Sequence, residues 1–121
     1  ISWLGDRGVE CTPQKAVHIY NLDIAVGGRT SIEILGGSWH GQKSRRLKEA
    51  SRLEYLLCAG ISVIYVWDTH FMPMTERCAD QCIAILDSIG SLPPGRGKYW
   101  VIRGDGEITT FFVTILTNLP S

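Results

Sequence analysis

The sequence predicts a single α/β domain built on a mixed β-sheet. Two strand-like stretches, residues 22–26 and 30–35, are separated by Gly27-Gly28, a favourable hairpin turn because glycine accepts positive φ. An apolar run at 61–67 follows a helical stretch at 44–58, and a crossover of this kind lays the later strand parallel to an earlier one. The 121 residues are enough for one core, which we expect over residues 16–90.

The elements of the first two thirds can be predicted in order. Residues 1–13 show little periodicity and predict an irregular lead-in. Residues 16–20, 22–26 and 30–35 are rich in β-branched or aromatic side chains and predict strands. Ser44 is the expected cap of a helix that runs to about Cys58 and ends before Gly60. The nearly continuous apolar run at 61–67 predicts a strand that is covered on both faces.

The last third predicts one helix and one hairpin. Thr75 is the expected cap of a helix that runs to about Ile89, and the Pro- and Gly-rich residues 92–97 interrupt the pattern. Strand-like residues 99–103 and 108–116 flank Gly104-Asp105-Gly106, so we expect a C-terminal hairpin within residues 98–117.

Composition indicates an ordinary globular chain, with 45% hydrophobic and 20% charged residues. The formal net charge is zero, so any electrostatic indication of nucleic acid must be local. Such a local cluster lies between Lys43 and Arg52, where a surface role in solubility is the alternative. No apolar run approaches the roughly 20 residues that a membrane span needs. We therefore expect no membrane partner and a cytoplasmic or nucleoid-associated location.

The four cysteines lack the spacing of a disulfide scaffold or of a zinc finger. Cys78 and Cys82 lie one helical turn apart on an apolar stripe, which favours packing in the core over metal binding with His70.

Four side chains are candidates for catalysis. Asp23 and Glu33 fall on neighbouring antiparallel strands, and two adjacent carboxylates repel each other unless a cation or a proton lies between them. His40 follows a bend of small residues and precedes the basic helix. Glu49 lies on the helix side that turns toward the sheet, although a pair with Arg45, Arg46 or Arg52 is an equal alternative. Carboxylates, a proton acceptor and positive charge are the groups that phosphodiester hydrolysis needs.

The segments that carry these residues resemble one known family. LDIAV, IEILGGSWHG, SRRLKEASRLEYLLCAG and ISVIYVWD, together about residues 17–68, resemble the very-short-patch-repair endonucleases and the EDxHD homing endonucleases. These enzymes are a branch of the PD-(D/E)xK superfamily. The resemblance implies a restriction-endonuclease-like fold, a mixed central sheet flanked by helices, to which the C-terminal hairpin is an addition.

The resemblance also implies roles for individual residues. Asp23 matches the metal-binding aspartate, Ile34 the position whose backbone carbonyl binds the metal, and Glu33 the acid of the (D/E)xK pair. His40 matches the general base, and Glu49 the position of an acid that orients it. The implied cofactor is Mg²⁺ or Mn²⁺. One departure is that leucine, at position 35, stands where the superfamily has lysine.

These observations predict a Mg²⁺-dependent endonuclease that acts on double-stranded DNA. Four basic residues are expected to bind its phosphates, namely Lys43, Arg45, Arg46 and Arg52. The alternative is a catalytically inactive domain of the same fold that serves DNA binding or assembly in a larger complex. A third interpretation is an unrelated α/β interaction module. A homodimer or a larger assembly is compatible with the sequence.

Overall fold

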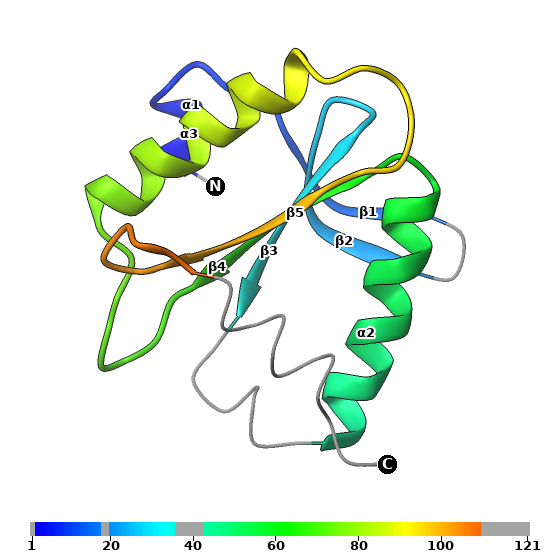
Figure 1. The fold of residues 1–121 in the computed structure, drawn as a ribbon. Helices are drawn as coiled ribbons and strands as arrows, with labels where there is room; N and C mark the ends of the chain where they lie inside the picture. The colour runs from blue at the N-terminus through cyan, green and yellow to red at the C-terminus, as the bar shows by residue number, and fades with distance from the viewer. Residues whose placement is uncertain (1, 18–19, 36–42, 110–121) are drawn as a thin grey trace.

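The computed structural model describes residues 2–17, 20–35 and 43–109, which form an α/β fold (Figure 1). The elements follow in the order α1 (Ser2–Gly5), β1 (Thr12–Val17), β2 (Tyr20–Val26), β3 (Thr30–Leu35), α2 (Lys43–Cys58), β4 (Ser62–Trp67), α3 (Glu76–Gly90), β5 (Tyr99–Arg103) and β6 (Ile108–Thr109).

The six strands form one mixed sheet in the order β1-β2-β3-β4-β5-β6. β1, β2 and β3 pair antiparallel, β3, β4 and β5 pair parallel, and β6 returns antiparallel to β5. The predicted parallel pairing of residues 30–35 with the run at 61–67 is confirmed, with Thr30 opposite Ser62 and Leu35 opposite Trp67. The helix between these two strands is the crossover that this arrangement requires.

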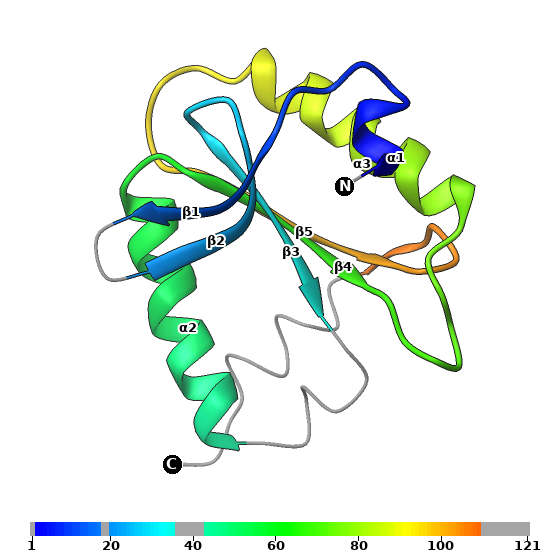
Figure 2. The same cartoon turned by 180° about the vertical axis from the view of Figure 1, so that it is seen from behind.

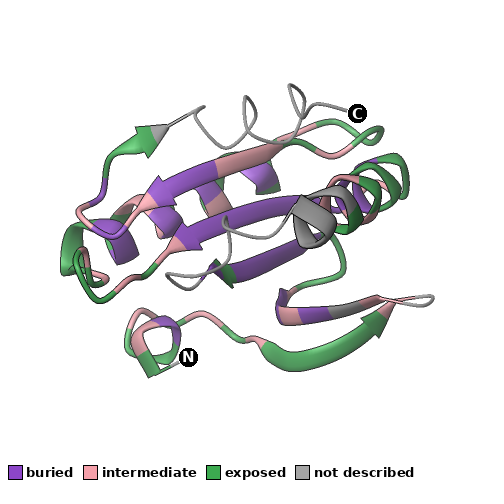
Figure 3. Cartoon of the chain, turned by 90° about the horizontal axis from the view of Figure 1, so that it is seen from below, coloured by how far each residue is buried: buried purple, intermediate pink, exposed green. Residues whose placement is uncertain are grey.

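Each face of the sheet is covered by a different helix, because side chains alternate along each strand. Val63 and Tyr65 of β4 pack in a core cluster with leucines of α2, whereas Ile64 and Val66 pack with α3. In Figure 3 the buried residues lie along the central strands, while β1 at the edge is exposed. The prediction that residues 61–67 form a strand buried on both faces is thus confirmed for its central part.

The cysteines of α3 are core residues, as predicted. Cys78 and Cys82 are fully buried and pack in the α3-side cluster. Burial raises the pKa of the Cys78 thiol to about 11 and that of Cys82 to about 12, so both remain protonated at neutral pH. Within the described residues, no three His, Cys, Asp or Glu side chains are grouped so that they could hold a metal ion.

The predicted irregular lead-in is wrong at its beginning. Residues 2–5 form the single turn α1, whose Leu4 is fully buried against the α3-side cluster. Arg7 then bonds to Glu76 and, at 3.2 Å, to Asp80, both on α3. One helical turn is too short to show a hydrophobic period, so the sequence pattern could not reveal it.

Several element bounds also differ from the prediction. β1 begins at Thr12 and includes Pro13, which an edge strand tolerates because its outer N–H groups need no partner. The predicted strand 16–20 is instead divided between two strands: Ala16 and Val17 end β1, Tyr20 begins β2, and residues 18–19 lie outside the described residues. α2 begins at Lys43, which places Ser44 inside the helix rather than at its cap. The Thr75 cap is confirmed, since its side chain accepts a bond from the Cys78 N–H at 3.3 Å.

The C-terminal hairpin is confirmed where the structure describes it. β5 and β6 pair through Val101 with Thr109 and through Ile102 with Ile108. The rest of the predicted second strand, 110–116, lies outside the described residues. None of the helices in the described ranges is long and apolar enough to cross a membrane.

Candidate functional site

The candidate site lies where β2 and β3 separate. The two strands pair only from Val26–Thr30 to Ile24–Ile32, and beyond Ile24 the strand β2 pairs with β1 alone. Figures 1 and 2 show β3 running away from β2 past this point. Extending the register by one residue would place Asp23 opposite Glu33. The predicted proximity of the two acidic residues is therefore consistent with the register, and it occurs at a fork in the sheet.

Side chains replace the missing backbone pairing at this fork. The Asp23 N–H donates to Oε2 of Glu33 at 2.8 Å, and the Ile34 N–H donates to Oδ2 of Asp23 at 3.1 Å. Each carboxylate thus satisfies a backbone N–H that a regular ladder would have bonded to a carbonyl. This exchange joins Asp23 and Glu33 across the two strands.

The strand β2 is irregular at Asp23. Leu22 packs in the α2-side cluster, whereas Ile24, two residues along, packs in the α3-side cluster. In a regular strand these two side chains would share a face, so the alternation is broken between them. The face that a regular strand would give Asp23 can therefore not be read from the alternation of its neighbours.

Glu33 belongs to a buried network between the sheet and α2. The residue is only 5% exposed, and its Oε2 also accepts the Ser31 hydroxyl at 2.8 Å. Its other oxygen, Oε1, forms an ion pair with Arg52 of α2. Charges that are removed from water in this way are stable only when they are paired or hydrogen-bonded.

Arg52 links Glu33 to Glu49. Its guanidinium donates to Oε1 of Glu49 at 3.0 Å, one helical turn away on α2. The same Glu49 oxygen accepts the hydroxyl of Tyr65 at 2.6 Å. The sequence left two alternatives for Glu49, a pair with an arginine of its own helix and a position turned toward the sheet. The structure shows both, because Glu49 pairs with Arg52 and also accepts a bond from Tyr65 of the sheet. The side chains of Arg52 and Glu49 are 13% and 14% exposed, so this is not a surface pair.

The charges of the network are unequal. Asp23, Glu33 and Glu49 carry three carboxylates, and Arg52 is the guanidinium paired with two of them. Burial raises the pKa of the Glu33 carboxyl above its ordinary value, although Arg52 and the Asp23 N–H act in the opposite direction. Burial disfavours the charged form of Arg52, but Glu49 and Glu33 outweigh this and raise its pKa. The site therefore has a surplus of negative charge when all four groups are ionised.

The structure brings together only part of the predicted site. Asp23, Glu33 and Glu49 adjoin one another through Arg52 and the fork. Arg52 was predicted to bind phosphates, but its guanidinium is engaged with two carboxylates inside the domain. His40 lies outside the described residues, and the basic side chains at positions 43, 45 and 46 do as well.

Two partners in the network were not singled out from the sequence. Ser31 and Tyr65 donate to Glu33 and Glu49. Their signal was present, because Ser31 shares a strand face with Glu33 and Tyr65 is the register partner of Glu33 on β4. A serine and a tyrosine in a buried strand need hydrogen-bond partners, and the adjacent carboxylates supply them.

The chain has no significant match among protein-family models, curated proteins or solved structures. Functional inference therefore depends on the site itself. Ligands of α/β sheets bind beyond the carboxyl ends of parallel strands, and Glu33 lies two residues before the end of β3. The chain from β3 to α2 leads from this edge through His40 to the basic first turns of the helix.

The oxygen atoms at the fork are of the type that a hard divalent cation prefers. Mg²⁺ is commonly held by one or two carboxylates and completes its octahedron with water. Asp23 and Glu33 carry two carboxylates on adjoining strands, and Ile34, the next-to-last residue of β3, has a backbone carbonyl, so these three residues could provide oxygen ligands. These groups are all oxygen ligands, the type that Mg²⁺ and Mn²⁺ prefer.

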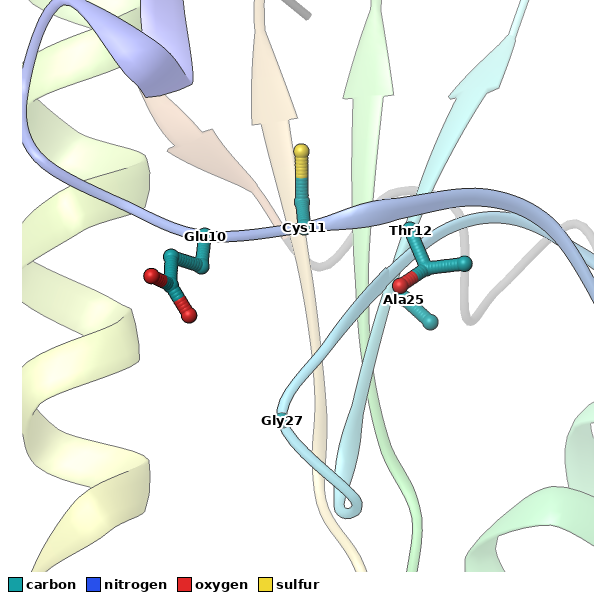
Figure 4. Close-up of a pocket in the computed structure, with 5 residues that line it drawn as sticks. All are labelled: Glu10, Cys11, Thr12, Ala25 and Gly27. Atoms are coloured by element: carbon teal, nitrogen blue, oxygen red, sulfur yellow. The ribbon is translucent and has the colours of Figure 1, made fainter.

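A separate depression of about 500 Å³ lies at the other end of the β2–β3 hairpin (Figure 4). It is lined by Glu10, Cys11, Thr12, Ala25 and Gly27. In Figure 4 the Cys11 thiol points away from the Glu10 carboxylate, so the two groups do not converge on one ligand. The fork thus remains the better candidate.

Proposed function

We propose that this domain is a metal-dependent endonuclease of the restriction-endonuclease-like type that hydrolyses phosphodiester bonds in double-stranded DNA. The observation that supports this most is the pair of carboxylates joined across the fork, Asp23 and Glu33, at the carboxyl edge of the parallel strands. The surplus of negative charge at the fork favours binding of a cation. The adjoining basic helix favours binding of a polyanion.

Each residue of the candidate site has a separate role in the proposed hydrolysis. Asp23, Glu33 and the Ile34 carbonyl would hold the cation, which would supply Lewis-acid polarisation of the phosphate when bound. His40 would accept a proton from the attacking water, whose oxygen forms the new P–O bond, while one ester P–O bond breaks and the leaving alkoxide takes a proton from solvent. Glu49 would orient His40, and Lys43, Arg45 and Arg46 would bind phosphates of the DNA backbone.

A direct cleavage assay tests the proposal. The unmodified chain, incubated with supercoiled and linear duplex DNA, should produce nicked or cut products with Mg²⁺ or Mn²⁺ and none after chelation by EDTA. The reason is that oxygen ligands alone provide no strong electrophile without a bound cation. Absence of products with either metal, over varied substrates and concentrations, would refute the endonuclease proposal.

A second candidate is a catalytically inactive domain of the same fold that binds DNA. Two observations favour it: Arg52 already occupies one oxygen of Glu33, and the residue in the lysine position, Leu35, is buried in the core. DNA binding without metal-dependent cleavage is the outcome that would select this candidate.

The basic helix makes a prediction that both candidates share. Each phosphate contact by Lys or Arg adds roughly 0.9 to the slope of log affinity against log salt on duplex DNA. Replacing Arg45 and Arg46 with alanine should therefore flatten the slope by about two units and weaken binding to all sequences alike. Fluorescence anisotropy across a salt series measures this.

The matched control for that experiment is Arg77→Ala. Arg77 lies on α3 and forms an exposed ion pair with Glu107, away from the fork. Its removal should leave the slope unchanged. An equal slope for the Arg45/Arg46 variant and the unmodified chain would mean that the cluster only solubilises the helix.

A further inference from the structure

Arg52 is largely buried although it lies on a helix at the surface of the sheet. An arginine on α2 would ordinarily place its guanidinium in water, yet the Arg52 side chain is 13% exposed and turned toward the sheet. It lies between Glu33 on β3 and Glu49 on its own helix. The guanidinium therefore occupies the position of a counter-ion between two largely buried carboxylates.

Each of those carboxylates also has hydrogen bonds that do not involve Arg52. Glu33 is held by the Asp23 N–H and the Ser31 hydroxyl, both at 2.8 Å to Oε2. Glu49 is held by the Tyr65 hydroxyl at 2.6 Å. Oε1 of Glu33, which accepts neither the Asp23 N–H nor the Ser31 hydroxyl, is the oxygen that pairs with Arg52.

We propose that Arg52 is an internal substitute for the divalent cation: it neutralises Glu33 in the metal-free domain and is displaced from Glu33 when the cation binds. This inference rests on the proposed function for the identity of the cation. A monovalent guanidinium and a divalent ion cannot share one carboxylate oxygen at close range without repulsion, so they compete for it. Glu49 retains Arg52 after the exchange, because the two are neighbours on one helix.

The competition has a physical consequence for affinity. As long as Arg52 holds Glu33, part of the cation's binding free energy is spent on breaking that ion pair. The domain then binds the metal weakly by itself. DNA phosphates, which attract Arg52 and provide further oxygen ligands, would favour the exchange. Arg52 thereby couples cation binding to the presence of nucleic acid.

The test measures Mn²⁺ binding without DNA, by isothermal titration calorimetry on the full chain. In Arg52→Gln the competing charge is removed but a hydrogen-bonding side chain remains, so the Mn²⁺ dissociation constant should fall tenfold or more. The control is Arg96→Gln. Arg96 forms an exposed ion pair with Glu54, which lies on α2 like Arg52, and the substitution breaks this pair. That variant should bind Mn²⁺ as the unmodified chain does.

A second variant and a second measurement guard against misfolding. Arg52→Lys keeps the positive charge, but a compact ammonium cannot bridge two carboxylates as a planar guanidinium does. It should also bind Mn²⁺ more tightly than the unmodified chain, by a smaller factor. In both variants Mn²⁺ should raise Tm more than it does in the unmodified chain, because a ligand that binds only the folded state stabilises it.

The outcomes separate this inference from the proposed function. Unchanged or weaker Mn²⁺ binding in both Arg52 variants would mean that Arg52 is only a structural ion pair, and it would overturn the inference even if the unmodified chain cleaves DNA. Tighter Mn²⁺ binding in a variant of a chain that never cleaves DNA would support the inference and refute the nuclease. Failure of every form to bind Mn²⁺ would overturn the inference, whereas the proposed function would still be decided by the DNA cleavage assay, in which DNA phosphates can complete the metal site.

Discussion

Replacing His40 with alanine should lower the rate of metal-dependent DNA cleavage by about 10²–10⁴-fold, the usual contribution of a positioned general base. Among the three histidines, His40 is the one that lies between the end of β3 and the basic helix. The loss should appear in kcat measured at saturating DNA, since proton transfer belongs to the chemical step. Single-turnover cleavage kinetics provide the measurement.

Two controls distinguish proton transfer from a structural role for His40. Added imidazole should partly restore cleavage by His40→Ala, because a small base can take the place of the missing ring, whereas it cannot repair a misfolded domain. His70→Ala is the matched variant: His70 is exposed and stacks edge-on with Phe71, at a ring-centroid distance of 5.5 Å. It should cleave at the unmodified rate. A His40→Ala chain that cleaves normally would remove His40 from the mechanism.

The sheet topology could be predicted because it depends on signals spread over many residues. A glycine turn, a helix of 16 residues and a buried apolar strand leave few ways to connect β3 with β4. The burial of Cys78 and Cys82 followed in the same way from helical periodicity. The sheet topology and the buried face of α3 follow from repeating hydrophobic patterns, so they can be predicted from the sequence alone.

The candidate site was less predictable because it breaks the regular pattern. Arg52 was one of three possible partners of Glu49 in the sequence, but the pattern gave no sign that the same arginine would also reach Glu33. Side-chain and backbone bonds are exchanged at Asp23, and the alternation of faces breaks between Leu22 and Ile24, which a strict period of two cannot represent. Bonds between distant elements decide such geometry, and a single sequence does not display them.

A substitution at Asp23 should change the rate of DNA cleavage much more than it changes the stability of the fold. Asp23→Asn removes the charge of the metal ligand but keeps an oxygen that can accept the Ile34 N–H, which Oδ2 of Asp23 now accepts at 3.1 Å. Lewis-acid stabilisation by the cation amounts to several kcal/mol, and each 1.36 kcal/mol is tenfold in rate, so cleavage should fall roughly 10²–10³-fold. The free energy of unfolding should change by less than about 1 kcal/mol.

Asp23→Ala is the variant to compare with Asp23→Asn. It removes the charge and also the acceptor for the Ile34 N–H, so it should lose cleavage to a similar extent and in addition lose about 1 kcal/mol of stability. Urea denaturation and cleavage kinetics on the same preparations give both quantities. If Asp23→Asn cleaved DNA at the unmodified rate, Asp23 would serve only to bridge the fork. The two carboxylates would then be structural substitutes for the missing strand pairing, and the inactive, DNA-binding domain would become the better account of the chain.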